Sequence, residues 1–261
     1  MSAILINGGI VHYEVIGRGR PIIYIHGWVG SWRYWVPALQ NSSMNFRSYA
    51  LDLWGFGDSA RDMQNYNLDK QIELIDQFLL EMGIGRVALV GHGLGALIAI
   101  LFAARAPQIV DRVMAISCPM DFNAVNTRLR TGDLSDLSEW LLAKSTVHDP
   151  AREDAMKSDS LAIVASFNNP DMVNVSSRLV SGKTPTLLVY GQNDPAITIP
   201  VYDPLTLPEY THNIILEGAG HFPMLDDPAR FNRLLTDWLA LESGESPRDL
   251  QLKEEWRRRV R

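Results

Sequence analysis

Two side chains late in the chain have the chemistry to move a proton between bound groups. Asp194 follows the apolar segment Pro185–Tyr190, and His221 follows the segment His212–Glu217. In open α/β folds, the groups just beyond the strands lie at the carboxyl edge of the sheet, where ligands bind. An imidazole with a carboxylate at that edge can support general acid–base catalysis. These two positions therefore predict a proton-transfer site at one edge of a sheet.

A sharp turn near the middle of the chain lacks a reactive side chain where one is expected. The segment Arg86–Val90 is predicted to be a strand, and Gly95–Arg105 a helix of small and apolar residues. The run between them reads G-H-G-L-G, which has the spacing of the nucleophile elbow G-x-S-x-G with Gly93 in place of serine. Glycine accepts the strained backbone of such an elbow, but it offers no nucleophile.

Several further motifs resemble those of the α/β-hydrolase family over residues 3–240. In chain order they resemble an oxyanion loop, the turn after the fourth strand, an acid-bearing loop and a histidine loop: His26–Gly30, Asp52–Ser59, Thr186–Asp194 and Gly218–Pro223. Each motif is weak alone, but their order and spacing favour one fold. The resemblance implies an α/β-hydrolase fold, with an eight-stranded, mostly parallel sheet, helices on both faces and a helical cap insertion.

The resemblance also implies roles for individual residues. The family order of nucleophile, acid and histidine corresponds to Gly93, Asp194 and His221 in this chain. Asp194 would orient the imidazole, and the backbone N–H groups of Trp28 and Leu94 would stabilise an oxyanion. Neither N–H group depends on its own side chain. All parts of a serine hydrolase site except the hydroxyl are therefore expected.

Asp121, just past the sixth predicted strand, is the alternative carboxylate to Asp194. The other polar residues near these motifs are interpreted as structural. His26 and His92 resemble family residues that support the loops from below, and Ser59 is a turn residue. Cys118 is interpreted as a small buried hydrophobe rather than a substitute nucleophile.

Three functions are compatible with this pattern. The first is a small-molecule carboxylic ester hydrolase whose serine is replaced by Gly93, naturally or by engineering, so that acyl-enzyme turnover is not available. The second is a cofactor-free enzyme in which His221, held by Asp194, acts as general base on water or on an acidic substrate proton. The third is a ligand-binding pseudo-hydrolase. Dehalogenases and epoxide hydrolases with an aspartate nucleophile are excluded, because position 93 carries no carboxylate.

The predicted elements alternate between apolar β-branched runs and segments of helical period, which is typical of a mainly parallel sheet. The first two strands are expected to form a hairpin through an Asn-Gly-Gly turn. The predicted strands lie near Ala3–Asn7, Ile10–Gly17, Pro21–Ile25, Arg47–Asp52, Arg86–Val90, Asp111–Ser117, Pro185–Tyr190 and His212–Glu217. The predicted body helices lie near Trp32–Leu39, Asn67–Met82, Gly95–Arg105 and Pro228–Leu241.

The predicted domain organisation is a hydrolase body, residues 1–118 and 185–242, interrupted by a helical cap at 119–184 and followed by a charged tail at 243–261. The cap stretch is too long for a structureless connection. It contains segments of helical period at Leu134–Lys144 and Met156–Asn168. By resemblance, Trp140 and Phe167 in the cap are candidate substrate contacts, with packing onto the body as the alternative.

Composition limits the partners and cofactors. The formal net charge of −6 argues against a nucleic-acid partner, which requires a concentrated basic face. No apolar run or leader pattern indicates a membrane span or signal peptide, so a cytoplasmic location is the default expectation. Cys118 is the only cysteine and no H-E-x-x-H motif occurs, so neither a metal nor another cofactor is predicted. The expected partner is a small-molecule substrate or ligand, and the sequence does not determine the oligomeric state.

Overall fold

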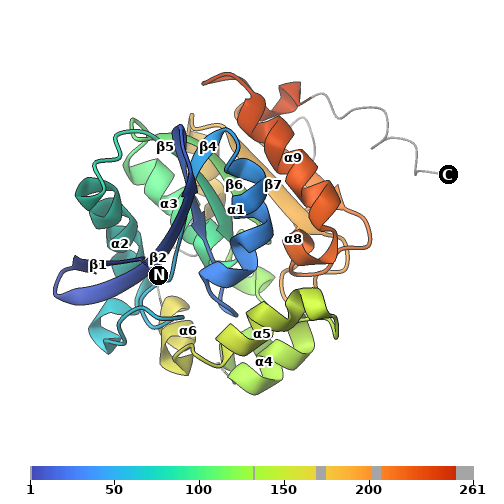
Figure 1. Cartoon of the computed structure of the whole chain (residues 1–261). Helices are drawn as coiled ribbons and strands as arrows, with labels where there is room; N and C mark the ends of the chain where they lie inside the picture. Colours follow the sequence, from blue (N-terminus) through green and yellow to red (C-terminus); the bar gives the residue numbers. More distant parts are fainter. Residues whose placement is uncertain (1, 132, 169–174, 202–206, 251–261) are drawn as a thin grey trace.

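The centre of the molecule is an eight-stranded sheet (Figure 1). The computed structural model describes residues 2–131, 133–168, 175–201 and 207–250. The strand order is β1-β2-β4-β3-β5-β6-β7-β8. The strands are β1 (Ser2–Ile6), β2 (Gly9–Gly17), β3 (Arg20–Ile25), β4 (Phe46–Leu51), β5 (Val87–His92), β6 (Val110–Ile116), β7 (Thr186–Gly191) and β8 (Thr211–Leu216).

The sheet is antiparallel at one edge and parallel elsewhere. β1 and β2 form a hairpin, and β2 pairs antiparallel with β4, whereas all pairs from β4 to β8 are parallel. The hairpin turn places Asn7 and Gly8 at φ of 48° and 83°. Positive φ at both central residues is the requirement of the tight hairpin turn that the Asn-Gly pair predicts. The parallel strands bring their carboxyl ends to one edge.

Helices cover both faces of the sheet. The helices α1 (Val36–Ser42) and α9 (Pro228–Ala240) contact each other on one face, and α2 (Leu68–Glu81) and α3 (Leu94–Arg105) contact each other on the opposite face (Figure 1). Every residue of β5 is buried, as expected for a parallel strand enclosed by two helical layers. The predicted fold class, an eight-stranded and mostly parallel sheet with helices on both faces, is confirmed.

The helix α3 is apolar on all sides because it is enclosed. It packs on β5 and β6, and it is flanked by α2 and by a further helix, α7 (Val175–Ser181). Residues 94–103 are all buried. A helix without a polar face is typical of a position inside a protein core. This burial fixes the start of α3, which follows Gly93, against the end of the sheet.

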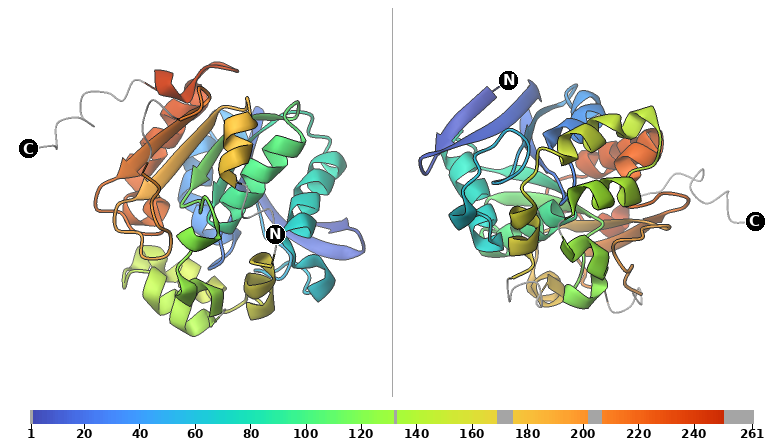
Figure 2. Two further views of the ribbon diagram at one scale, coloured as in Figure 1. Left: turned by 180° about the vertical axis from the view of Figure 1, so that it is seen from behind. Right: turned by 90° about the horizontal axis from the view of Figure 1, so that it is seen from below.

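The chain between β6 and β7 carries short helices at the carboxyl end of the parallel strands. Figures 1 and 2 show three of them grouped beyond that edge, and the fourth, α7, contacts α3. They are α4 (Leu134–Leu141), α5 (Asp149–Ala155), α6 (Ser160–Ser166) and α7 (Val175–Ser181). We call residues 119–184 the insertion. A further short helix, α8 (Pro223–Asp226), follows β8. Single 3-10 turns lie at Trp32–Trp35, Met63–Asn65, Phe122–Ala124, Thr127–Thr131, Thr146–His148 and Pro247–Asp249.

One predicted helix of the insertion is shorter than expected. A helical segment was predicted near Met156–Asn168, and α6 starts at Ser160 and ends at Ser166. The helix starts late because the Asp159 carboxylate accepts the N–H of Leu161 at 2.9 Å and caps it. Aspartate prefers this capping geometry to a place inside a helix.

The part of the tail that the structure describes, up to residue 250, lies on the body. The Ser243 hydroxyl donates to Asp111 at 2.6 Å, and Arg248 donates to the carbonyl of Leu207 at 2.5 Å. Residues 251–261 of the predicted charged tail lie outside the described residues. Among the described helices, none combines the length and the apolar character that crossing a membrane requires.

Candidate active site

Asp194 and His221 lie in contact at the carboxyl edge of the sheet. The Nδ1 atom of His221 is 3.0 and 2.9 Å from the two carboxylate oxygens of Asp194, and both side chains are almost fully buried. The backbone N–H groups of Ala196 and Ile197 donate to Oδ1 of Asp194 at 2.8 and 3.1 Å. Because a carboxylate only accepts, Nδ1 of His221 carries the hydrogen in this contact. Within the described part of the chain, no group bonds to Nε2.

The electrostatics of the pair favour an ionised Asp194. Burial raises the pKa of this carboxyl, but the charge and hydrogen bond of His221 lower it, as does the N–H of Ala196. The net pKa lies below the usual value for aspartate. A carboxylate that stays ionised beside an imidazole stabilises the imidazolium form. The negative charge of Asp194 therefore supports the positive charge that His221 gains when it accepts a proton as a general base.

The chain turns sharply between β5 and α3, and glycine occurs there for two different reasons. Gly93 has φ of 51° and ψ of −109°, a conformation that is costly for a residue with a Cβ atom. At Gly91 and Gly95 space is limiting: a Cβ atom would lie 2.2 Å from the carbonyl oxygens of Gly95 and Ile25, respectively. The sharp turn that the motif predicts is thus present, with a glycine at its centre.

His92 connects the elbow to the loop that carries His221. The two imidazole rings lie 4.6 Å apart between centroids, and Nε2 of His92 is 2.8 Å from the carbonyl oxygen of His221. This contact requires the hydrogen on Nε2, so Nδ1 accepts a hydrogen bond from the Tyr34 hydroxyl at 3.0 Å. The same hydroxyl accepts the N–H of Gly27 at 2.6 Å. One chain of hydrogen bonds therefore fixes the oxyanion-type loop, the elbow and the histidine loop relative to one another.

His92 is electrically neutral in the folded chain. Burial lowers its pKa well below the usual value for histidine, and the charge of His221 acts in the same direction. The sequence motifs indicated a supporting role for His92 but gave no indication of Tyr34. The only signal for Tyr34 is its place shortly after the oxyanion-type loop, which does not specify a contact.

The two predicted oxyanion donors come from the expected backbone positions. Leu94 is the first residue of α3, so its N–H has no acceptor inside the helix. Trp28 lies in the loop that follows β3. Across the described ranges, neither N–H donates to another backbone or side-chain group. Both residues are buried, which leaves two uncommitted donors next to the elbow.

The two predicted substrate contacts lie in different surroundings. The ring of Phe167 stacks on the indole of Trp28, with centroids 5.2 Å apart and an angle of 16°. Trp140 instead lies under Arg128, whose guanidinium carbon is 4.8 Å from the centroid of the indole ring. No contact between described residues joins Trp140 to His221. Only Phe167 is therefore next to the candidate site, and a substrate contact remains a prediction for both residues.

The alternative carboxylate, Asp121, and the residues interpreted as structural all have structural surroundings. The carboxylate of Asp121 is exposed and caps a turn by accepting the N–H groups of Asn123 and Ala124. His26 uses both ring nitrogens, with the carbonyl of Gly27 and the N–H of Leu53. Burial raises the pKa of the Cys118 thiol, which disfavours the thiolate that a nucleophile needs.

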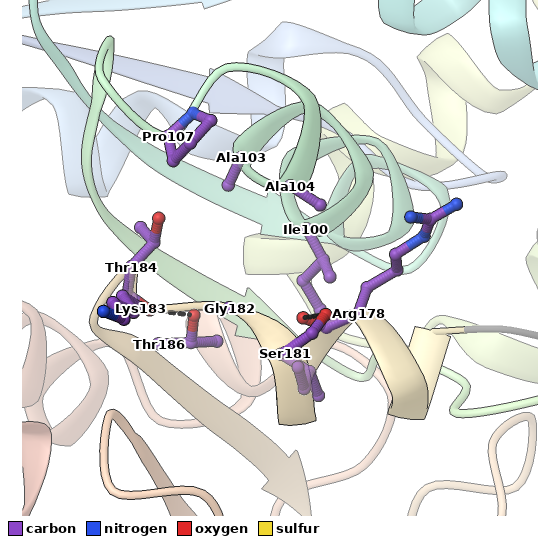
Figure 3. Close-up of a pocket in the computed structure, with 11 residues that line it drawn as sticks. Ile100, Ala103, Ala104, Pro107, Arg178, Ser181, Gly182, Lys183, Thr184 and Thr186 are labelled. Carbon is purple, nitrogen blue, oxygen red and sulfur yellow. Dashed lines mark hydrogen bonds between the residues drawn. The ribbon is translucent and has the colours of Figure 1, made fainter.

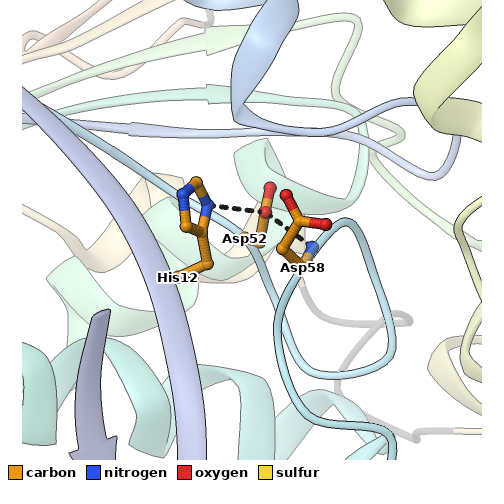
Figure 4. Close-up of side chains that lie close together, drawn as sticks. All are labelled: His12, Asp52 and Asp58. Atoms are coloured by element: carbon orange, nitrogen blue, oxygen red, sulfur yellow. Dashed lines mark hydrogen bonds and ion pairs between the residues drawn. The ribbon is translucent and has the colours of Figure 1, made fainter. Parts of the chain in front are cut away.

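Two further features lie away from this site. A cavity of about 320 Å³ between α3 and α7 has Arg178 and Lys183 at opposite ends (Figure 3), and no residue of the candidate site lines it. His12, Asp52 and Asp58 form a polar cluster whose ligand atoms lie within 4.8 Å of one another (Figure 4). Of the described residues, this cluster alone has the donor types and spacing of a metal site. The carboxylate of Asp52 already accepts hydrogen bonds from backbone N–H groups.

Comparison with known proteins agrees with this architecture. A family model described as the alpha/beta hydrolase family matches residues 22–234, and the chain belongs to this family. The soluble epoxide hydrolase of Corynebacterium sp. (strain C12) is 30% identical over 112 residues, which is 43% of this chain but only 39% of that protein. The putative carbamate hydrolase RutD of Stutzerimonas stutzeri (strain A1501) is 25% identical, and the match covers 90% of this chain and 98% of RutD.

One solved structure with a similar fold carries a serine-to-glycine substitution. It is a Ser-to-Gly mutant of the N-acyl homoserine lactonase AidH, complexed with N-hexanoyl homoserine lactone. The TM-score is 0.77 at 20% identity, and the match covers 91% of this chain and 96% of that chain. At this identity the likeness establishes the fold alone.

Proposed function

We propose that this chain is a small-molecule hydrolase of the carboxylic ester class, in which Gly93 replaces the serine and the His221–Asp194 pair acts directly on water. The observation that carries the proposal is the intact pair beside an elbow that lacks a nucleophile. The insertion would act as a cap over this site.

The proposed reaction needs no covalent intermediate. Nε2 of His221 takes a proton from a water molecule, and the water oxygen forms a bond to the substrate carbonyl carbon. The N–H groups of Trp28 and Leu94 stabilise the resulting oxyanion. The tetrahedral species then breaks its bond to the leaving alkoxide, which receives the proton from His221. Asp194 stabilises the imidazolium between these two steps.

The residue at position 93 favours a carbonyl substrate over an epoxide, although epoxide hydrolases are among the similar proteins. Epoxide hydrolysis through an ester intermediate needs a carboxylate nucleophile, and position 93 offers none. The putative carbamate hydrolase, which matches over nearly its full length, has a name that implies attack at a carbonyl carbon. A small carboxylic ester or related acyl compound is therefore the proposed substrate class.

Short-chain aryl esters test the proposal. His221→Ala should reduce hydrolysis to the buffer rate, whereas His212→Ala, which removes a histidine on β8 outside the site, should have no effect. Gly93→Ser should increase the rate by about 10²-fold or more, because loss of the serine in subtilisin costs about 10⁶ in turnover. Hydrolysis by the parent chain that persists in His221→Ala would show that the pair is not the base.

The enclosure of the site favours ligand binding without turnover as a second candidate. Trp28, Phe167 and His221 are 1%, 7% and 2% exposed. If neither the parent nor Gly93→Ser hydrolyses any ester, a small acyl compound that raises the melting temperature of the parent would establish binding. If the chain only binds this compound, the compound should raise the melting temperature of His221→Ala as well.

A further inference from the structure

The side chain of Trp28 lies against the empty position of the elbow. A Cβ atom built on Gly93 would lie 3.0 Å from two carbon atoms of the indole ring. Carbon atoms in van der Waals contact are normally about 3.5–4.0 Å apart. Any side chain at position 93 must therefore displace the indole by a few tenths of an ångström. Whether a hydroxyl can work there depends on how firmly the ring is held.

The insertion holds the indole on two sides. Nε1 of Trp28 donates to the Ser166 hydroxyl at 2.8 Å, and that hydroxyl in turn donates to the carbonyl of Ile163 at 2.6 Å within α6. Phe167, the residue after α6, stacks on the ring face. Trp28 and Ser166 are almost fully buried, so the hydrogen bond between them is shielded from water. The indole is thus clamped between the elbow and the end of α6.

We propose that Trp28 is the residue that determines what position 93 and the adjacent acyl space can accommodate. Clamped by Ser166 and Phe167, its indole fits a glycine at the elbow and crowds any larger residue. Restoring the serine is then not sufficient for full reactivity, because the introduced hydroxyl is misplaced until the indole is released. This inference deepens the proposed function and rests on the same His221–Asp194 pair.

A fluorophosphonate probe measures the reactivity of a hydroxyl without requiring the natural substrate. The oxygen of the introduced serine forms a bond to phosphorus, the phosphorus–fluorine bond breaks to release fluoride, and the hydroxyl proton passes to Nε2 of His221. Covalent labelling is followed by intact-protein mass spectrometry. The parent chain, with Gly93, provides the background.

Release of the indole should accelerate labelling. Against Gly93→Ser alone, we expect the double variants with Ser166→Ala or Trp28→Leu to react about tenfold faster or more, because overpacking and misplacement typically cost at least that factor. Ser166→Ala keeps the indole itself but frees it to move, because it removes the hydroxyl that accepts the N–H of Trp28. Leucine at position 28 keeps the backbone N–H that the site needs.

A matched control comes from the same insertion. Ser138 in α4 is also buried, and its hydroxyl also bonds back to a carbonyl three residues earlier, but it has no contact with Trp28. Gly93→Ser with Ser138→Ala should label at the rate of Gly93→Ser. Gly93→Ser with His221→Ala should not label.

The outcomes separate this inference from the proposed function. Equal labelling rates for Gly93→Ser with and without release of the indole would overturn the role of Trp28 and leave the proposed function standing. Absence of labelling in all variants, including the one with Trp28→Leu, would also overturn the role of Trp28, because release of the indole would then not restore reactivity. The proposed function is overturned separately, by ester hydrolysis in the parent chain that persists in His221→Ala. A second measurement is independent of reactivity: the indole N–H resonance, assigned with Trp28→Phe, should shift in Gly93→Ser, and an unchanged resonance would contradict the crowding.

Discussion

Among the described residues, two histidine–aspartate pairs are almost completely buried and have nearly the same geometry. Nδ1 of His221 is 2.9 Å from Oδ2 of Asp194, and Nδ1 of His12 is 3.0 Å from Oδ2 of Asp52 (Figure 4). Both aspartate side chains are completely buried. Distance and burial therefore do not distinguish a candidate site from a structural contact.

The surroundings of the two pairs do distinguish them. Both oxygens of Asp52 accept backbone hydrogen bonds, from Trp32 on Oδ1 at 2.9 Å and from Asp58 on Oδ2 at 3.0 Å. Nε2 of His12 lies 3.6 Å from the Glu14 carboxylate. This pair ties β2 to the turn after β4 and to the start of the Trp32 turn. The second nitrogen of His12 thus lies near a carboxylate, whereas no described group bonds to Nε2 of His221.

The His221 pair differs in how its carboxylate is used. The N–H groups of Ala196 and Ile197 both bond to Oδ1 of Asp194, and Nδ1 of His221 lies within hydrogen-bonding distance of Oδ2. An asparagine at this position can keep both backbone bonds through its single oxygen. Its NH₂ group then faces Nδ1 of His221 and forces the hydrogen onto Nε2.

The largest expected effect follows from this difference. Asp194→Asn should lower His221-dependent hydrolysis by on the order of 10⁴-fold, as the wrong tautomer does in serine proteases, and should change the free energy of unfolding little. Asp52→Asn should change hydrolysis little but lower the free energy of unfolding by about 1–3 kcal/mol. Its NH₂ group faces the N–H of Asp58 and leaves that donor unsatisfied. Urea unfolding and ester hydrolysis measure the two quantities. Equal losses of stability in both variants would remove the distinction between the pairs.

His92 and His12 should affect the free energy of unfolding in opposite directions as the pH changes. The pKa of His92 lies well below 6.5, mainly through burial, so the unfolded chain takes up a proton below pH 6.5 and the folded chain does not. The free energy of unfolding should then fall by about 1.4 kcal/mol per pH unit below that value. His92→Gln, whose amide can bond to both neighbours, should flatten this slope. An unchanged slope would show that His92 does not contribute it.

His12 should show the opposite sign. Its pKa is raised above 6.5, first by the hydrogen bond to Asp52, so its stabilisation is complete below pH 6.5 and is lost as the pH rises through the folded value. His12→Gln should therefore destabilise the chain more at pH 5.5 than at pH 8.5, as measured by urea unfolding at both values. A loss that is larger at pH 8.5 would contradict the ion pair.

Much of this arrangement was predictable from the sequence, because the signals for it lie within short segments of the chain. The runs that form β5 and β7 are apolar, and the positions of Gly93, Asp194 and His221 follow from the turns after strands. The contact between His12 and Asp52 was not predictable, because the residues are 40 positions apart and no motif marks His12. The indole of Trp28 meets Ser166 from 138 positions away, and the motif around Trp28 specifies its backbone but not its side chain.

The smallest expected effect concerns a third pair, which links the insertion to the histidine loop. Nε2 of His148 is 2.9 Å from Oδ1 of Asp226, whose Oδ2 accepts the N–H of Gly220 at 2.7 Å. His148→Ala should cost about 1 kcal/mol of unfolding free energy, the net value of a typical hydrogen bond, and His148→Gln less, since glutamine keeps a donor. Thermal and urea unfolding of the two variants measure this difference.

The same variants test whether the insertion is only a cover. Gly220 precedes His221 directly, so the contact with Asp226 lies next to the candidate base, although His148 does not touch the His221–Asp194 pair. If the insertion only encloses the site, fluorophosphonate labelling of Gly93→Ser should be the same with and without His148→Ala. If labelling falls by a factor of ten or more and recovers in His148→Gln, the insertion positions His221. The boundary between the catalytic region and its structural surroundings would then include His148.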